Sequence, residues 1–84
     1  MKLSKKRDIL DELDKKITKL LNERFIIVEK IKKIKEQDDI PITDIKREKQ
    51  VIATNKQYID ERFHKQFENI YQALIEASKE IQEL

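Results

Sequence analysis

The chain has 84 residues, with no Cys, no Gly and a single His, His64. This composition excludes disulfide bonds, thiolate or His-cluster metal sites, glycine-rich phosphate-binding loops and a Cys-based or well-placed Ser–His nucleophile. Charged residues make up 43% of the chain, yet the net charge is only +2 and both signs are interspersed, which is typical of solvated helix faces and not of a nucleic-acid-binding tail.

The first predicted element is a long helix from about Ser4 to Lys35 or a little beyond. Ser4 is a suitable N-cap, because its side-chain oxygen can accept a hydrogen bond from the free N–H groups of the first turn. No Pro or Gly interrupts this segment. The stretch 37–41 ends it, because the residue before Pro41 is disfavoured in a helical conformation.

An arginine lies in the middle of the apolar stripe of this helix. The stripe repeats every three or four residues and consists of Leu10, Leu13, Ile17, Leu20, Arg24, Ile27, Ile31 and Ile34. A guanidinium cannot lose its proton to escape burial, so Arg24 requires an anion. The stripe contains no Asp or Glu. The anion must therefore come from another helix, for example from Glu48 in a structural ion pair, or from a ligand.

The length of this helix predicts a dimer. About 32 helical residues span roughly 48 Å, whereas a compact globule of this chain length has a radius of gyration of about 12 Å and a diameter near 30 Å. The helix must therefore project from its own fold with part of its apolar stripe uncovered. We expect the long helices of two chains to pack together.

The second predicted helix is short and runs from Thr43 or Asp44, either of which can cap it, to Ala53. One of its faces, at the spacing i, i+3, i+4 and i+7, carries Asp44, Arg47, Glu48 and Val51. The stretch 54–57 is predicted to be the least structured part of the chain.

The third predicted helix begins near Asp60 and runs to the C-terminus. Its apolar stripe consists of Phe63, Phe67, Ile70, Leu74, Ala77, Ile81 and Leu84. A second stripe beside it consists of Tyr71, Ile75, Ser78 and Gln82. This second stripe places two neutral hydrogen-bonding groups one turn apart, next to a core face.

Two cations share one face of the first helix. Arg24 and Lys35 are separated by three turns plus about 20°, with their Cα atoms about 16 Å apart, so both can reach toward one small anion. Arg7 lies about 25 Å from Arg24 and roughly 100° round the helix, so it cannot serve the same pocket from the same chain, but in an antiparallel dimer it could serve the pocket of the partner. Each of these charged residues also has an ordinary structural interpretation. Lys35 can complement the helix dipole, Arg7 can be solvated and Asp44 can be a helix cap.

The chain also carries no sign of export or membrane insertion. No apolar run approaches membrane-spanning length, and the basic start Met1–Arg7 lacks the apolar segment of a signal peptide. The basic run at 30–35 lacks the interleaved aromatic residues of a nucleic-acid site. We expect one small domain, residues 1–84, located in the cytoplasm, with no membrane or nucleic-acid partner.

Two segments of the chain resemble signatures of the AroQ-class (all-α, type II) chorismate mutases. Asp14–Arg24, DKKITKLLNER, is similar to the family pattern Leu-Asp-x-x-(Ile/Leu)-x-x-Leu-(Ile/Leu)-x-x-Arg, and Pro41–Glu48, PITDIKRE, is similar to Pro-x-x-Asp-x-x-Arg-Glu. The matching order of further polar residues extends the resemblance over about the whole chain: Arg7, Lys35, Ser78 and Gln82. The resemblance implies an all-α fold of three helices (long, short, long) in an intertwined homodimer, with each site roofed by the partner's first helix.

The resemblance also implies roles for residues around chorismate, which carries two carboxylates, an enol ether oxygen and a ring hydroxyl. Arg24 of one chain and Arg7 of the other would bind the carboxylates, and Lys35 would bridge a carboxylate and the ether oxygen. Gln82 would donate to the same ether oxygen, and Glu48 would accept from the ring hydroxyl. The remaining implied substrate contacts are Asp44, Arg47 and Ser78, with apolar walls from Leu10, Ile31, Val51 and Ile75.

The implied reaction suits such a chain. Chorismate becomes prephenate, a step in phenylalanine and tyrosine biosynthesis, by a pericyclic rearrangement that needs no nucleophile, metal, cofactor or acid–base pair. The enzyme would hold the enolpyruvyl arm over the ring and stabilise the charge that grows on the ether oxygen. The implied catalytic residues are Arg24, Lys35, Glu48 and Gln82.

Two alternatives remain open at this point. An isochorismate-pyruvate lyase shares the architecture and the cationic clamp, although the motif Asp44-x-x-Arg47-Glu48 favours the mutase because it serves the ring hydroxyl. The other alternative is a non-catalytic helical dimerisation or regulatory module. The chain is short and begins with Met1, so a stand-alone enzyme is the simpler expectation.

Overall fold

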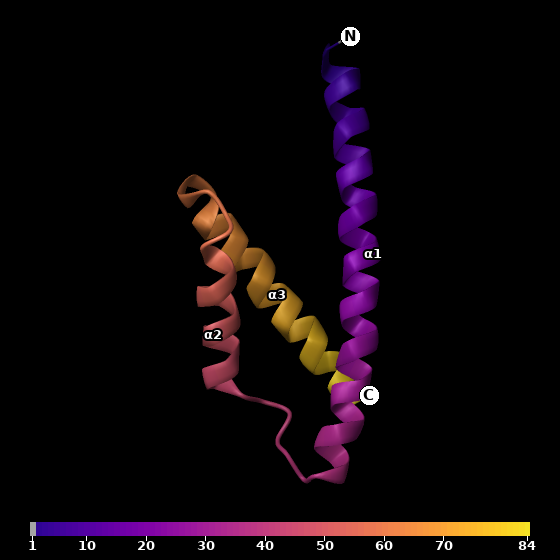
Figure 1. Ribbon diagram of the computed structural model, residues 1–84, viewed down its shortest axis with the longest axis vertical. Coiled ribbons are helices and arrows are strands. Elements are labelled where there is room, and N and C mark those ends of the chain that lie inside the picture. The colour runs from indigo at the N-terminus through magenta and orange to yellow at the C-terminus, as the bar shows by residue number, and fades with distance from the viewer. Residues whose placement is uncertain (1) are drawn as a thin grey trace.

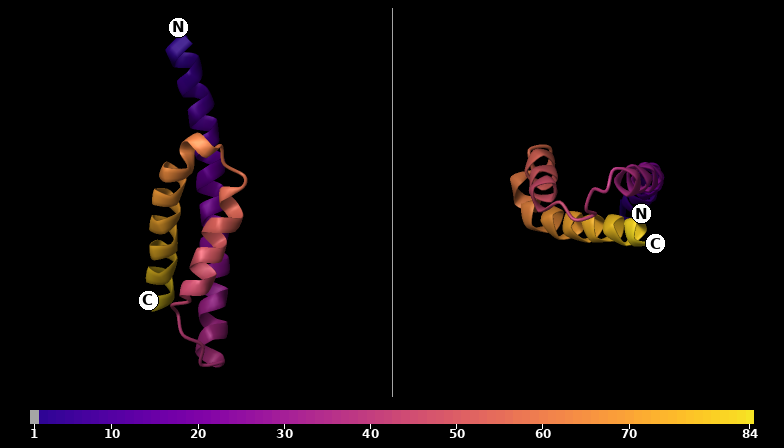
Figure 2. Two further views of the ribbon diagram at one scale, coloured as in Figure 1. Left: turned by 90° about the vertical axis from the view of Figure 1, so that its left-hand side faces the viewer. Right: turned by 90° about the horizontal axis from the view of Figure 1, so that it is seen from below.

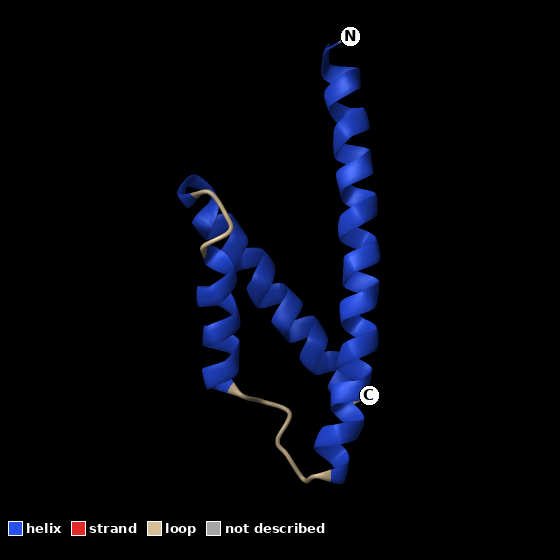
Figure 3. Cartoon of the chain, viewed as in Figure 1, coloured by secondary structure: helices blue, strands red, loops and turns tan. Residues whose placement is uncertain are grey.

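The computed structural model describes residues 2–84 and consists of helices joined by short segments (Figures 1 and 3). The elements are α1 (Lys2–Gln37), α2 (Ile45–Lys56), the short 3₁₀ helix η1 (Glu61–Phe63) and α3 (His64–Glu83). The prediction of an all-α fold with a long, a short and a long helix is confirmed. None of the described helices combines the length and apolar character needed to cross a membrane. Met1, where the predicted domain begins, lies outside the described residues.

The ends of the helices follow from local hydrogen bonds. Asp44 caps α2 as predicted, because its Oδ1 accepts from the Arg47 N–H at 3.0 Å. Asp60 caps η1 in the same way and so begins the third helical segment. After α1, Asp39 adopts a left-handed conformation (φ 56°), and the Ile40 N–H donates to the Lys35 carbonyl at 2.8 Å, as in a Schellman motif.

Two predicted boundaries are wrong. Ser4 is not a cap, because α1 already begins at Lys2 and the serine lies within its first turns. The stretch 54–57 is not a loop, since α2 continues to Lys56. Two side chains stabilise this last turn: Asn55 Nδ2 donates to the Val51 carbonyl at 2.8 Å, and the Lys56 ammonium pairs with Glu68 of α3. A contact to a distant helix thus outweighs the weak helix propensity of Thr54 and Asn55.

The helix α3 holds the other two helices apart. It packs against both α1 and α2, whereas the backbones of α1 and α2 do not pack against one another. Viewed from below, the chain is shaped like a U, with α3 as its base and α1 and α2 as its arms (Figure 2). The buried residues Val28, Ile75 and Ser78 lie on α1 and α3.

The N-terminal half of α1 begins well beyond the ends of α2 and α3 and then runs level with the upper part of these helices (Figure 1). Every residue from 2 to 20 is exposed. The longest dimension is 56 Å and the radius of gyration is 15.9 Å, compared with about 12 Å for a compact globule of this length. This half exposes the large apolar side chains Leu3, Ile9, Leu10, Leu13, Ile17 and Leu20. We call residues 2–20 the projecting arm.

Candidate active site

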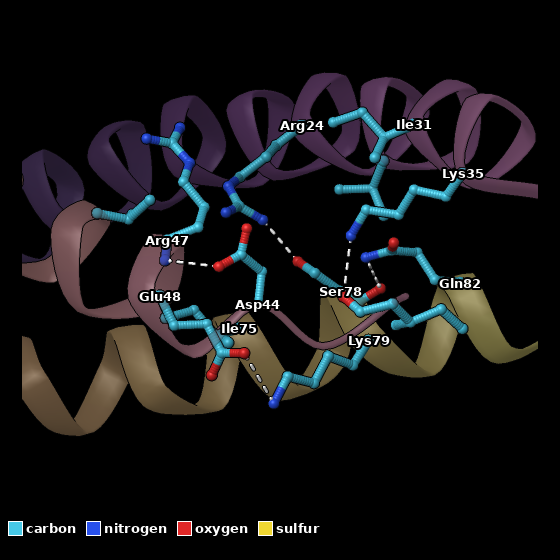
Figure 4. Close-up of a pocket in the computed structure, with 13 residues that line it drawn as sticks. Arg24, Ile31, Lys35, Asp44, Arg47, Glu48, Ile75, Ser78, Lys79 and Gln82 are labelled. Atoms are coloured by element: carbon cyan, nitrogen blue, oxygen red, sulfur yellow. Dashed lines mark hydrogen bonds and ion pairs between the residues drawn. The ribbon is translucent and has the colours of Figure 1, made fainter. Parts of the chain in front are cut away.

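A cavity of about 320 Å³ lies inside the U (Figure 4). This volume is at the lower end of the range found for small-molecule pockets. Its lining consists of Arg24, Val28, Ile31 and Lys35 from α1, Ile42 and Asp44 from the segment before α2, Arg47, Glu48 and Val51 from α2, and Ile75, Ser78, Lys79 and Gln82 from α3.

Ten of the twelve residues that the sequence assigned to a substrate site line this one cavity. The two exceptions are Arg7 and Leu10, which are exposed on the projecting arm and do not line it. Their predicted place in a partner's site is therefore a prediction about the dimer and not about the single chain.

Three lining residues were missed by the sequence analysis. Val28 follows Arg24 by one helical turn, but the chosen apolar stripe ran through Ile27 instead. Lys79 follows Ile75 by one turn and so shares the face of the second stripe of α3, which is the signal that could have revealed it. Ile42 lies in an irregular segment, where no periodicity indicates which way a side chain points.

The face of α1 that reaches the cavity is Arg24–Val28–Ile31–Lys35, with a 4-3-4 spacing. Ile27 and Ile34 of the predicted stripe are instead 51% and 52% exposed. The helix therefore presents two adjacent faces, one to its own cavity and one that the single chain leaves uncovered.

Arg24 has no carboxylate partner among residues 2–84. Its Nη1 donates to the Ser78 hydroxyl at 2.5 Å, and that hydroxyl donates in turn to the Leu74 carbonyl at 2.9 Å. The alternative in which Glu48 neutralises Arg24 is wrong, because Glu48 Oε2 lies 3.0 Å from Lys79 Nζ. Arg24 thus faces the cavity with its positive charge uncompensated by the protein's own acids.

Lys35 points into the cavity region and not into solvent (Figure 4). Its ammonium donates to the carbonyl of Ile42 at 2.9 Å. An ammonium has three N–H donors, so this bond leaves two for other acceptors. This hydrogen bond also links the segment before α2 to α1, and both of its residues line the cavity.

The α2 side of the cavity carries both signs of charge. Asp44 lines it while serving as the helix cap. The Arg47 guanidinium is exposed and donates to the Gln50 side chain at 3.0 Å. Glu48 is half-buried and paired with Lys79, whose pKa is raised, chiefly by the hydrogen bond to Glu48.

The α3 side supplies neutral polar groups. Ser78 is only 7% exposed. Gln82 Nε2 makes a long contact of 3.4 Å to the Ser78 carbonyl, and Gln82 Oε1 is buried without a hydrogen-bond partner among the described residues. The Gln82 amide can therefore replace its long contact to Ser78 with a hydrogen bond to a ligand.

The charges of the lining suit an organic dianion. Four side chains are cationic (Arg24, Lys35, Arg47 and Lys79) and two are anionic (Asp44 and Glu48), which leaves two net positive charges. Apolar walls of Val28, Ile31, Val51 and Ile75 surround these groups and reduce the screening by water. The cavity can therefore hold a small, partly apolar molecule that carries two carboxylates.

Comparison with known proteins identifies the family of the chain. The chorismate mutase type II family matches residues 6–83. The chorismate mutase of Methanocaldococcus jannaschii is 39% identical over 85 aligned positions, which cover 96% of this chain and 84% of that protein. No solved structure gives a significant match. The chain therefore belongs to the chorismate mutase type II family.

Proposed function

We propose that this chorismate mutase binds chorismate in the cavity of the U and rearranges it to prephenate by positioning and electrostatics alone. The single observation that carries the proposal is that Arg24 and Lys35 both line the cavity and that neither has a carboxylate partner among residues 2–84. Charges in a partly buried site need counterions. The two carboxylates of chorismate supply them.

The rate enhancement comes from two effects. Arg24 and Lys35 hold a carboxylate and thereby keep the flexible enolpyruvyl arm over the ring, in a geometry close to that of the reaction. Lys35 and Gln82 donate to the ether oxygen, which becomes more negative as its bond to the ring breaks. Lys35 can do so while keeping its bond to Ile42, and Gln82 gives up only a long contact.

The other lining residues orient the ring. Glu48 accepts from the ring hydroxyl, with Asp44 beside it, and this contact separates the mutase from the isochorismate-pyruvate lyase of the same architecture. Arg47 and Ser78 complete the shell around the carboxylates. Ile31, Val51 and Ile75 form the apolar walls against which the ring packs.

The complete site needs a second chain. The U is open on the side opposite α3, and the apolar side chains of the projecting arm are exposed in the single chain. A large exposed apolar surface is typical of a protein–protein interface. The arm of a second chain can therefore cover the open side of the U. In an intertwined homodimer with antiparallel α1 helices, the arm of one chain roofs the cavity of the other. Arg7 would then bind a substrate carboxylate and Leu10 would extend the apolar wall. A cytoplasmic location remains part of this proposal.

The activity is tested by adding chorismate to the purified protein and following the loss of its ultraviolet absorbance. The wild type should accelerate the reaction, and Lys35→Ala should lose about 10²–10³ in kcat, the range seen when one donor to the developing charge is removed. Lys33→Ala is the matched control, since Lys33 is an exposed cation on α1 that does not line the cavity. No acceleration by micromolar wild-type protein would contradict the proposal. A preference for isochorismate, supplied separately, would indicate the lyase.

A further inference from the structure

Lys79 lines the cavity but has no part in the mechanism above. Its ammonium lies 3.0 Å from Glu48 Oε2 and 3.5 Å from Glu76 Oε1. The two acids differ in their surroundings, because the side chain of Glu48 is 20% exposed whereas that of Glu76 is 64% exposed. Lys79, itself 18% exposed, therefore joins a cavity carboxylate to one at the surface. Figure 4 shows its contact with Glu48.

Glu48 carries its carboxylate in a cavity that holds other negative groups. Asp44, the cap of α2, precedes Glu48 by one turn, and a bound substrate brings two more carboxylates. Like charges at such short range repel one another. The ammonium of Lys79, 3.0 Å from Glu48 Oε2, offsets this repulsion.

The two oxygens of Glu48 are not equivalent. Oε2 is buried and accepts no well-aligned hydrogen bond among residues 2–84, so its contact is the ion pair with the Lys79 ammonium at 3.0 Å. No group among residues 2–84 donates a hydrogen bond to Oε1. The ion pair thus orients the carboxylate and leaves one oxygen without a partner in the protein.

We propose that Lys79 is a positioning residue that acts through Glu48, holding Oε2 in an ion pair so that Oε1 can accept from the ring hydroxyl of the substrate. This inference rests on the proposed role of Glu48. The raised pKa of Lys79 supports it, because the ammonium stays charged throughout the neutral range. Since Lys79 is engaged by two acids, it does not itself act as a clamp for a substrate carboxylate.

A double-mutant cycle tests whether Lys79 acts through Glu48. Lys79→Met removes the charge and keeps the length of the side chain, and we expect kcat/KM to fall about ten-fold, the effect of losing one charge-assisted hydrogen bond. Glu48→Gln removes the charge that Lys79 serves. In the Glu48→Gln background, Lys79→Met should cost less than about two-fold, because the interaction is already gone.

Further variants separate this role from a structural one. Lys79→Arg keeps the charge and should stay within about three-fold of the wild type. Glu76→Gln is the matched control, because it removes the exposed partner of Lys79 and should leave the activity unchanged. Circular dichroism should show native helix content in every variant. If Lys79→Met does not fold, Lys79→Gln, which keeps a hydrogen-bond donor, replaces it in the cycle.

The cycle also identifies the two competing explanations. A structural defect in Lys79→Met, or a direct contact of Lys79 with the substrate, would give the same loss in the wild-type and Glu48→Gln backgrounds.

The outcomes are distinguishable. If the wild type does not turn over chorismate, both the proposed function and this inference fail. If the wild type is active and Glu48→Gln is as active as the wild type, the role of Glu48 fails, and with it the role of Lys79. If Glu48→Gln is impaired but the effects of the two substitutions multiply without coupling, only the inference about Lys79 is overturned.

Discussion

Arg24 of α1 donates a hydrogen bond of 2.5 Å to the hydroxyl of Ser78 of α3, and this bond joins two sides of the cavity. We expect Ser78→Ala to leave Arg24 with one fewer partner and more rotational freedom. The apparent affinity for chorismate should then weaken, with kcat/KM falling about ten-fold, the order expected for one hydrogen bond to a charged group. Steady-state kinetics checks this, and Ser78→Thr, which keeps the hydroxyl, is the control. Equal losses in both variants would show that the bond is not what matters.

Gln82 should make the activity independent of pH near neutrality. Its amide is neutral and donates at any pH, so kcat should hold between pH 5 and 7. In Gln82→Glu the side chain donates only when protonated, so kcat at pH 7 should fall by about 10²–10³ and recover in part in acid. The check is a kcat–pH profile of both proteins. A sharp loss of wild-type activity between pH 5 and 7 would count against this role of Gln82.

The sharing of sites between chains can be tested by mixing two inactive variants. Arg7→Ala removes the cation that the arm is proposed to contribute to the partner's site, and Lys35→Ala removes a cation that lines the chain's own cavity. If Arg7 crosses to the partner, each mixed dimer contains one site with neither substitution, and the activity should return to about a quarter of the wild-type value when subunits assort at random. Mass spectrometry of the mixture verifies that subunits exchange. No recovery in a mixture with proven exchange would place Arg7 outside the partner's site.

The projecting arm should be the main contact of the dimer. Ile17 is 54% exposed in the single chain, and Ile17→Glu would place a charge in the predicted interface, where it would be buried without a partner. Light scattering should show the wild type as a dimer at micromolar concentration and the variant as a largely dissociated chain. Lys16→Glu alters the adjacent position and serves as the control. A well-folded wild-type monomer would refute the dimer.

The contact between Lys56 and Glu68 should stabilise α2 in a pH-dependent way. The hydrogen bond from Lys56 is the main cause that lowers the pKa of Glu68 below its ordinary value near 4.5. A lowered pKa means that the contribution to stability is present above the ordinary pKa and is lost as the pH falls through the lowered value. Glu68→Gln should therefore melt at a lower temperature than the wild type at pH 7, and the difference should shrink below about pH 4.5. Glu80→Gln, at an exposed position of α3, should show no such difference.

The elements of the fold were readable from the sequence where a local rule determines them. Thr43 and Asp44 were both predicted as possible caps of α2, because a short polar side chain before a helical pattern can accept from a free N–H group, and Asp44 Oδ1 is the acceptor in the structure. The long first helix followed from the absence of Pro and Gly. The end of α2 was misjudged because Lys56 is stabilised by Glu68, which lies far along the chain and on another helix.

The cavity was predictable to the extent that its residues repeat with the helical period. Ile75, Ser78 and Gln82 lie on one predicted stripe, and these three of its four residues line the cavity. Lys79 was overlooked because its partner Glu48 belongs to another helix, and no rule of spacing links the two. The predicted role of Arg7 depends on a second chain and therefore stays a prediction.

The α2–α3 contact and the predicted self-association surface involve different helices. The distance between the α2 and α3 sides of the cavity depends on how α2 crosses α3, whereas the arm predicted to mediate self-association belongs to α1, against which α2 does not pack. Substitutions along the α2–α3 contact can therefore widen the cavity for a bulkier dicarboxylate while α1 stays unchanged. This makes α2 the natural starting point for redesigning substrate preference.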